Sequence, residues 1–300
     1  MALLEQLGAD DLRRAVQGYR DALATHRDAI NRLNVYPVPD GDTGTNMALT
    51  LESVVAELDG AGADMAATCK AISHGSLMGA RGNSGVILSQ VLRGLADVFA
   101  EHDECDAAAF VQALDAAAAA AYGAVMRPVE GTILTVVRES AEAATAHAAA
   151  EGDAVTLVSV LDVARVAGGE SLERTPELLP VLADAGVGDA GGAVLLLLLD
   201  MMLHLTDSPD HPEPPEGSVE PMVATHGDDH ARSAEHDALA GLKYEVMYFL
   251  EAPDETIPAF KDVWAGIGDS IVVVGGDGIW NCHIHTDDIG ASIEAALDCG

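Results

Sequence analysis

The stretch from Asn34 to Met47 reads NVYPVPDGDTGTNM and separates two helical segments. Before it, apolar residues recur at helical spacing over residues 11–33, and after it a helix is predicted over residues 45–58. Its two prolines fix φ and favour extended backbone in the residues that precede them. Asp40 and Asp42 are one residue apart, so in extended backbone both side chains project to the same side. The stretch therefore predicts a rigid loop that points two carboxylates at one place.

The chemistry of this loop favours a metal ion next to an anion. Two carboxylates held close together are unfavourable unless a cation neutralises them. Thr43, Thr45 and Asn46 follow at once, and we expect them to supply an N-cap and free backbone amides that bind an anion. Mg²⁺ prefers one or two carboxylates plus phosphate oxygens, so it suits this arrangement. The string DGDTG is also typical of a plain turn followed by a helix cap, and alone it does not separate the two interpretations.

The first 205 residues are predicted to form an all-α domain. Hydrophobic residues make up 49% of the chain but aromatic residues only 4%, so alanine and leucine provide most of the packing, which favours helices. Almost nothing before residue 206 alternates with the period of a strand. Further helices are predicted over residues 64–74, 84–100, 106–126, 132–149, 154–166, 176–184 and 191–205. We expect eight or nine helices arranged as a barrel with one rim specialised for a ligand.

The composition changes after this domain. Residues 206–238 hold five of the twelve prolines and a single basic residue, Arg232, so we predict an acidic flexible linker. Residues 239–300 are predicted to begin an α/β middle domain. Its elements are a strand over residues 244–252, two strands around the turn GGDG, and a final helix. So few residues rarely make an independent core, so we expect a truncated piece of a longer protein.

Charge and cysteine usage exclude several classes of protein. The chain carries 15 basic and 49 acidic residues, a net charge of −34, which repels nucleic acid and anionic membrane surfaces. A solvated acidic surface explains most of this charge, and a nucleotide would need a metal ion to bridge it to the protein. The four cysteines have no paired spacing, and the N-terminus lacks the pattern of a signal peptide. The most apolar run, Ala193–Leu205, is too short to span a bilayer. We predict a soluble cytoplasmic protein without membrane insertion.

Three further glycine-rich turns precede predicted helices. One carries Gly82, Asn83, Ser84 and Gly85, the second carries Gly131 and Thr132, and the third carries Asp189, Ala190, Gly191 and Gly192. Glycine lets a phosphate approach the backbone, and a helix N-terminus attracts it. Each turn alone is also typical of a helix C-cap followed by an N-cap. Together with the DGD loop they indicate a nucleotide site, and the absence of a Walker lysine motif from the sequence excludes a P-loop enzyme.

Five motifs occur in an order that resembles a known family. The motifs NVYPVPDGDTGTNM, GSLMGARGNSGVILSQ, RPVEGTILTVVRESA, TPELLPVLADAGVGDAGG and HIHTDDIG resemble the kinase subunit of bacterial fatty acid kinase. The N-terminal part is similar to the nucleotide-binding subunit of dihydroxyacetone kinase. The resemblance covers nearly the whole chain apart from the linker. It implies an eight-helix barrel that holds ATP with two Mg²⁺ ions, then a middle domain and a C-terminal domain absent from this sequence.

The resemblance also implies an activity and roles for matching residues. The reaction is transfer of the ATP γ-phosphate to a fatty acid carried by a separate binding subunit, which gives an acyl phosphate for phospholipid synthesis. Asp40 and Asp42 match catalytic Mg²⁺ ligands, and Asn34 stands where a third, upstream aspartate is expected. The matching phosphate-binding residues are Thr43, Thr45, Asn46, Asn83, Ser84 and Gly85, with Thr132 nearby and Asp189 to Gly192 near the nucleoside.

A second candidate metal site lies on the strand WNCHIHT. His283 and His285 share one face of this strand, whereas Cys282 points to the other face. Some members of the resembled family carry a cysteine as a third Zn²⁺ ligand at the position that matches Glu245. Because glutamate also binds zinc, a Glu245–His283–His285 site is one interpretation. The other is that the two histidines pack or hydrogen-bond without a metal.

Two alternatives to the kinase subunit stay open at this point. One keeps the fold and makes the protein a dihydroxyacetone-type kinase subunit, although the sugar kinase subunit lacks the second domain. The other is a non-catalytic nucleotide-binding regulatory protein, although the intact DGD and GNSG motifs argue against a decayed site. The expected partners are ATP and a fatty-acid-binding subunit, and the sequence leaves a homodimer open.

Overall fold

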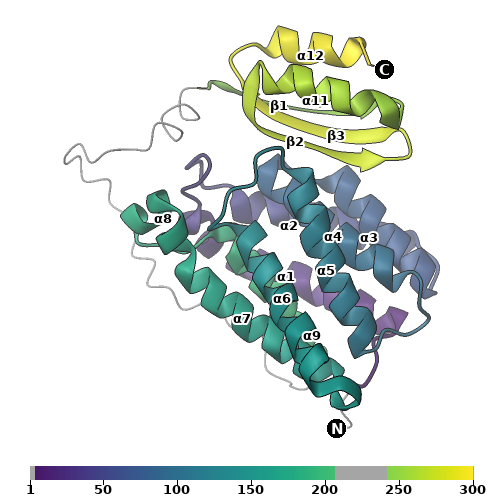
Figure 1. The fold of residues 1–300 in the computed structure, drawn as a ribbon. Coiled ribbons are helices and arrows are strands. Elements are labelled where there is room, and N and C mark those ends of the chain that lie inside the picture. The colour runs from purple at the N-terminus through teal and green to yellow at the C-terminus, as the bar shows by residue number, and fades with distance from the viewer. Residues whose placement is uncertain (1–3, 207–241, 300) are drawn as a thin grey trace.

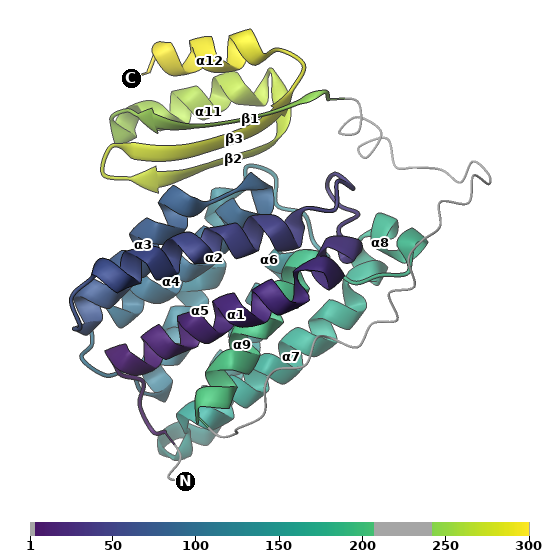
Figure 2. The same ribbon diagram turned by 180° about the vertical axis from the view of Figure 1, so that it is seen from behind.

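The computed structural model describes residues 4–206 and 242–299, which form a helical domain and a smaller α/β domain (Figures 1 and 2). The predicted boundary at residue 205 falls at the end of the last helix of the helical domain. Apart from Thr206, the predicted linker over residues 206–238 lies outside the described residues.

The described part of the helical domain is a closed ring of helices (Figure 2). Each long helix contacts the next, and the last contacts the first. Eight of the helices have 15 to 25 residues, whereas α8 has six, so the predicted all-α, eight-helix domain is confirmed. The helices are α1 (Ala9–Leu33), α2 (Thr43–Gly60), α3 (Met65–Gly79), α4 (Gly82–Phe99), α5 (Ala107–Ala124), α6 (Ile133–Glu151), α7 (Leu157–Leu178), α8 (Pro180–Ala185) and α9 (Ala190–Thr206), with a 3₁₀ turn at Gly152–Ala154.

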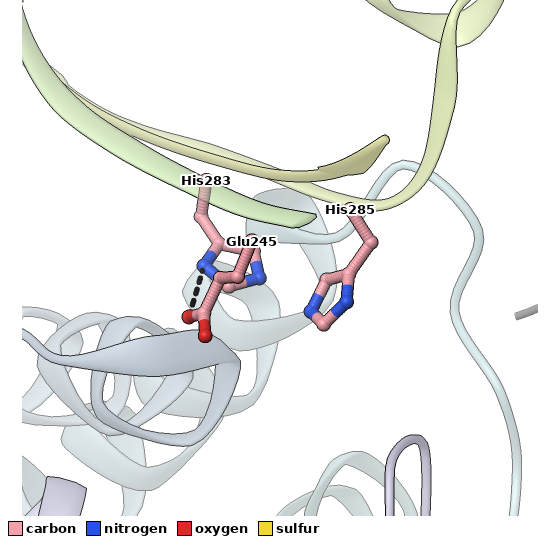
Figure 3. A group of neighbouring side chains, drawn as sticks. All are labelled: Glu245, His283 and His285. Carbon is pink, nitrogen blue, oxygen red and sulfur yellow. Dashed lines mark ion pairs between the residues drawn. The ribbon is translucent and has the colours of Figure 1, made fainter. Parts of the chain in front are cut away.

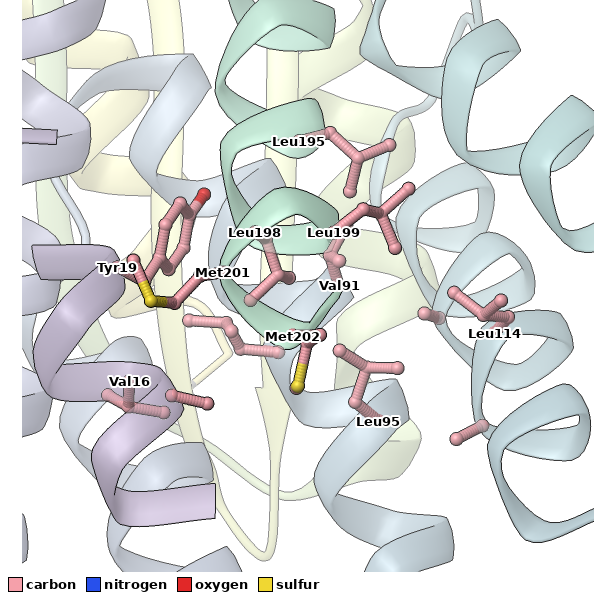
Figure 4. Packing of buried hydrophobic residues seen from close by; sticks show 14 of the residues in the cluster. Val16, Tyr19, Val91, Leu95, Leu114, Leu195, Leu198, Leu199, Met201 and Met202 are labelled. Carbon is pink, nitrogen blue, oxygen red and sulfur yellow. The ribbon is translucent and has the colours of Figure 1, made fainter. Parts of the chain in front are cut away.

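Helix α9 supplies the centre of the core. Its leucines are buried on all sides, and Figure 4 shows Leu198 and Met202 packed toward α1 and α4. Burial of each such side chain contributes roughly 1.5–3 kcal/mol. Tyr19 of α1 is fully buried, and its hydroxyl donates a hydrogen bond to the carbonyl of Val194 at 3.1 Å. This bond satisfies the one polar group that the tyrosine brings into the core.

Helix α7 differs from the prediction of two helices over residues 154–166 and 176–184. It runs without a break to Leu178, and only the short α8 follows. Gly168 lies within it because α7 packs closely on α6: a Cβ there would lie 2.5 Å from Oγ of Ser140. Pro176 lies in the last turn of α7. The glycines therefore reflect a close helix contact and not a chain break.

Helix α5 is the one described helix that is long and apolar enough to cross a membrane, and half of it is buried inside the domain. Phe110 and Leu114 of α5 belong to the core, and Phe110 stacks on Phe99 with ring centroids 6.0 Å apart. Its apolar composition therefore reflects packing against α4 and α6, as in the core helix of a globular domain.

The α/β domain is a three-stranded antiparallel sheet with two helices on one face (Figure 1). Its strand order is β1-β3-β2, and the predicted strands and final helix are confirmed. The helix α11 was not predicted; it buries Ile257, Phe260 and Trp264 against the sheet. The elements are β1 (Tyr244–Glu251), a 3₁₀ turn (Asp254–Thr256), α11 (Ile257–Ala265), β2 (Gly268–Gly276), β3 (Ile279–Thr286) and α12 (Ile289–Leu297).

The other face of the sheet is docked on the helical domain, toward α4 and α5 (Figure 1). Val125, just after α5, pairs as an antiparallel bridge with Val272 of β2. Arg93 of α4 donates a hydrogen bond to the carbonyl of Gly275 at 2.6 Å. Ala80, Val86, Ala124, Val272 and Val274 form a small apolar cluster across this contact. The sheet therefore covers the end of the ring where the DGD loop lies.

Candidate functional site

A cavity of about 500 Å³ lies between the helical domain and the sheet. Its walls are the loop before α2, the N-terminal ends of α2, α4, α6 and α9, and parts of all three strands. The predicted site residues in this wall are Asn34, Asp40, Asp42, Thr43, Asn46, Gly82, Asn83, Ser84, Thr132, Asp189, Ala190, Gly191, Glu245 and His285. The other predicted residues, Thr45, Gly85, Gly192 and His283, lie outside it. The four predicted helix N-termini thus meet at one cavity.

Two asparagines hold the start of α2. Oδ1 of Asn34 accepts hydrogen bonds from the hydroxyl of Thr43 and, at 3.0 Å, from its backbone amide. Oδ1 of Asn31 in α1 accepts a hydrogen bond from the amide of Thr45 at 3.1 Å. The expectation of free amides at this helix is therefore wrong for Thr43 and Thr45, because side chains before the helix already cap both.

The carboxyl groups of Asp40 and Asp42 lie close together at the cavity. Burial, the charge of Asp42 and a hydrogen bond between the two groups raise the pKa of Asp40 to about 6. A cation bound between the two groups would remove this repulsion. Asn34 differs, because Oδ1 accepts two hydrogen bonds and Nδ2 donates to the carbonyl of Val38 at 2.7 Å. Its amide is thus committed to holding the loop.

The N-terminus of α4 presents free donors to the cavity. Among the described residues, none accepts a hydrogen bond from the backbone amides of Gly82, Asn83 or Ser84. Oδ1 of Asn83 is buried without a partner in the same part of the chain. Gly82 has a φ of +57°, and a Cβ on it would lie 2.5 Å from Nδ2 of Asn46. The helix can approach α2 this closely only with glycine here.

Gly85, one turn further along α4, has a packing role. It is buried, and a Cβ on it would lie 2.6 Å from Oγ1 of Thr50 in α2. This glycine therefore sets the distance between α4 and α2, which places the free amides of α4 beside the DGD loop.

The N-termini of α6 and α9 are tied together by one carboxylate. Asp189 is buried, and its carboxylate accepts hydrogen bonds from the amide of Gly192 at 2.7 Å and from the amide of Ile133. Burial raises the pKa of Asp189 to about 6, although these hydrogen bonds lower it. The hydroxyl of Thr132 donates to the carbonyl of Val129 at 2.8 Å. These groups shape the wall of the cavity and are already paired.

The middle domain brings a carboxylate and two imidazoles together (Figure 3). Glu245 of β1 lies opposite His285 of β3, and Nδ1 of His283 lies 3.2 Å from Oε1 of Glu245. One ligand atom from each residue lies within 4.8 Å of the others. Nε2 of the fully buried His283 has no hydrogen-bond partner among the described residues. Cys282 packs on the other face of the sheet, with Phe260. The donor set fits Zn²⁺ with an open fourth position.

Sequence reasoning missed the part of the wall that β2 supplies. The pairing of β2 with β3 shifts between Asp269 and Val272, and Ser270 in this bulge has a φ of +49°. Asp269, Ser270, Ile271 and Val272 all line the cavity, as does Arg127 from the helical domain. No local pattern marks these residues, because their place depends on the docking of one domain on the other.

Comparison with protein families decides the family of the chain. Residues 37–204 match the DAK2 domain, and residues 241–300 match the FakA-like middle domain, named after fatty acid kinase. The chain belongs to the DAK2 domain family. With its middle domain, it is a FakA-like protein of the fatty acid kinase type.

Several bacterial proteins are similar to this DAK2 domain protein over most of its length. An uncharacterized protein of Staphylococcus saprophyticus is 38% identical over 280 residues, which are 92% of this chain and 50% of that protein. Protein YloV of Bacillus subtilis is 38% identical over 287 residues, which are 93% of this chain and 51% of that protein. The chain spans about half the length of these curated relatives.

Two solved structures align with the DAK2 domain protein. The native dihydroxyacetone kinase of C. freundii aligns with a TM-score of 0.49 and 17% identity over 67% of this chain and 35% of that chain. The same kinase in complex with AMP-PNP and Mg²⁺ aligns with a TM-score of 0.48 and 17% identity over the same shares of the two chains.

Proposed function

We propose that this chain is the ATP-binding part of a fatty acid kinase. The observation that supports it best is the meeting, in one cavity, of the Asp40–Asp42 carboxylate pair with the free amides of Gly82, Asn83 and Ser84. Groups that favour a cation thus lie beside groups that favour a phosphate, an arrangement that suits a nucleotide bound with Mg²⁺. The FakA-like middle domain supports a fatty acid as the acceptor.

Each part of the cavity has a role in the proposed complex. Asp40 and Asp42 hold Mg²⁺, with two ions expected, and this metal offsets the charge of the phosphates when bound. The free amides of α4 and the side-chain amide of Asn46 donate hydrogen bonds to phosphate oxygens. The nucleoside lies along the start of α9, where Asp189 fixes the backbone, and against apolar residues such as Ile133.

The threonines of the predicted site act through the shape of the loops. The groups of Thr43, Thr45 and Thr132 that could donate to a phosphate are in hydrogen bonds within the protein. They therefore hold the backbone that the free donors depend on, and Asn34 holds the loop in the same way.

The proposed acceptor is the carboxylate of a fatty acid held by a separate binding subunit. This carboxylate is already ionised at neutral pH, so its attack needs no general base. One of its oxygens forms a bond to the γ-phosphorus while the bond from that phosphorus to the bridging oxygen breaks. The products are ADP and an acyl phosphate, which would enter phospholipid synthesis in the cytoplasm.

Removal of both carboxylates tests this function. Asp40→Ala together with Asp42→Ala should lower Mg²⁺-dependent ATP consumption, measured with oleate and the lipid-binding partner, by about 100-fold or more. The helical circular dichroism spectrum should not change. Asp59→Ala, at an exposed position far along α2, is the matched control. Undiminished turnover by the double variant would contradict the assignment. Turnover with dihydroxyacetone in place of oleate would indicate a dihydroxyacetone-type kinase, and ATP binding without any turnover would indicate a regulatory protein.

A Zn²⁺ ion held by Glu245, His283 and His285 is a separate proposal. The buried, unpaired Nε2 of His283 and the nearby carboxylate support it. Elemental analysis of purified protein should find about one zinc per chain, and His283→Ala should remove it. His102→Ala, at an exposed histidine, is the control and should keep the metal. Equal zinc contents in wild-type protein and His283→Ala would rule this site out.

A further inference from the structure

The charge of the cavity wall presents a problem for any nucleotide. Five carboxylates line the cavity: Asp40, Asp42, Asp189, Glu245 and Asp269. Among the described residues of this wall, Arg127 is the only arginine or lysine. A polyphosphate brings several more negative charges to the same space. Metal ions at Asp40 and Asp42 would offset part of this charge, but phosphate oxygens on the far side need another cation.

Arg127 forms an ion pair across the two domains. Its Nη1 lies 3.2 Å from Oδ2 of Asp269 in the bulge of β2. The Arg127 side chain is 68% exposed and that of Asp269 is 35% exposed. Exposed pairs of this kind contribute only about 0.2–1 kcal/mol, because water screens them. The guanidinium can therefore leave Asp269 at little cost.

The backbone on either side of this pair stays anchored without it. The amide of Met126 donates to the carbonyl of Ile271 at 3.5 Å, and Val125 pairs with Val272. These contacts keep the residue next to Arg127 at the wall of the cavity. The guanidinium is thus a long, exposed cation on a fixed base, with a weak partner.

We propose that Arg127 is a substrate-binding residue that exchanges its ion pair with Asp269 for the phosphates of the bound nucleotide. This inference rests on the proposed ATP-binding function. A guanidinium donates two parallel hydrogen bonds to phosphate oxygens, and such charge-assisted bonds are stronger than a screened surface pair. In the free protein, Asp269 holds Arg127 at the wall. In the complex, Arg127 offsets the charge that the metal ions do not reach, including charge that would repel the incoming carboxylate.

Titration of the protein with ATP and MgCl₂ tests the exchange. Arg127→Gln should weaken ATP binding by about tenfold or more, the effect expected when a charged hydrogen bond is lost. Asp269→Asn should tighten ATP binding, because it frees Arg127 and removes a negative charge from the wall. Arg127→Lys keeps the charge and should lose less affinity than Arg127→Gln. The double variant should behave like Arg127→Gln alone.

Arg93→Gln is the matched control. Arg93 also joins the two domains, through the carbonyl of Gly275, but it does not line the cavity, so its loss should leave ATP affinity unchanged. If Asp269→Asn weakens binding as much as Arg127→Gln, the pair serves only to join the domains and the inference fails. It also fails if Arg127→Gln binds ATP as wild type does. Wild-type protein without measurable ATP affinity would overturn both this inference and the proposed function.

Discussion

Oδ1 of Asn34 accepts hydrogen bonds from both the backbone amide and the hydroxyl of Thr43. This contact ties the start of the DGD loop to the first residue of α2, so the loop closes on itself around Asp40 and Asp42. Asn34 is itself buried, and its Nδ2 donates to the carbonyl of Val38 in the same loop. The carboxylate pair is therefore held by an uncharged amide that is fully hydrogen-bonded.

Loss of this amide should destabilise the protein. Asn34→Ala leaves the amide of Thr43 and the carbonyl of Val38 buried without partners, which costs about 1–3 kcal/mol in the free energy of unfolding. Urea unfolding followed by circular dichroism measures the change. Asn34→Asp keeps an acceptor for Thr43 and should lose less. An Asn34→Ala variant as stable as wild type would show that the contact does not hold the loop.

The raised pKa of Asp40 should make stability depend on pH. Its pKa is about 6 in the folded protein against an ordinary value of 3.8, so between these values the folded state holds a proton that the unfolded chain has released. The free energy of unfolding should therefore fall as the pH rises from about 4 to about 6 in metal-free protein. Asp40→Asn should be more stable than wild type at neutral pH, by about 1 kcal/mol after allowance for solvent screening.

Thermal unfolding across this pH range, without metal, measures that effect. The slope should be smaller in Asp40→Asn but should not vanish, because Asp189 also has a pKa of about 6. Asp59→Asn, at an exposed site, should leave the slope unchanged. Identical pH profiles for wild type and Asp40→Asn would contradict the close approach of the two carboxyl groups.

Much of the fold could be predicted because its signals are local. Apolar residues recur at helical spacing through α1, and the strands of the middle domain stand around a glycine turn. The carboxylate pair of Asp40 and Asp42 was predictable for the same reason, since one intervening residue sets its geometry. The continuous α7 was not, because Gly168 resembles a break in the sequence and only its contact with Ser140 shows why glycine is there.

The rest of the site depends on contacts that sequence spacing does not reveal. The amides of α2 looked free in the sequence, but Asn31 reaches them from the previous helix. The amides of α4 looked the same and are free, because none of the described residues caps them. Arg127 and Asp269 come from different domains, and only docking of the sheet brings them together. Which helix N-terminus can bind a ligand is thus decided by tertiary contacts.

Gly82 provides the last prediction, because it combines a strained backbone with a close contact. Its φ is +57°, and a Cβ on it would lie 2.5 Å from Nδ2 of Asn46. Gly82→Ala should therefore lower the free energy of unfolding by about 1–3 kcal/mol and weaken ATP binding, since either the free amides of α4 or Asn46 must move. Gly123→Ala in α5 is the matched control: nothing lies within 4 Å of its Cβ position, and alanine there should stabilise the helix by up to about 1 kcal/mol. Urea unfolding and ATP titration of both variants measure the difference. If both behave alike, the fit of α4 against Asn46 has no bearing on the cavity.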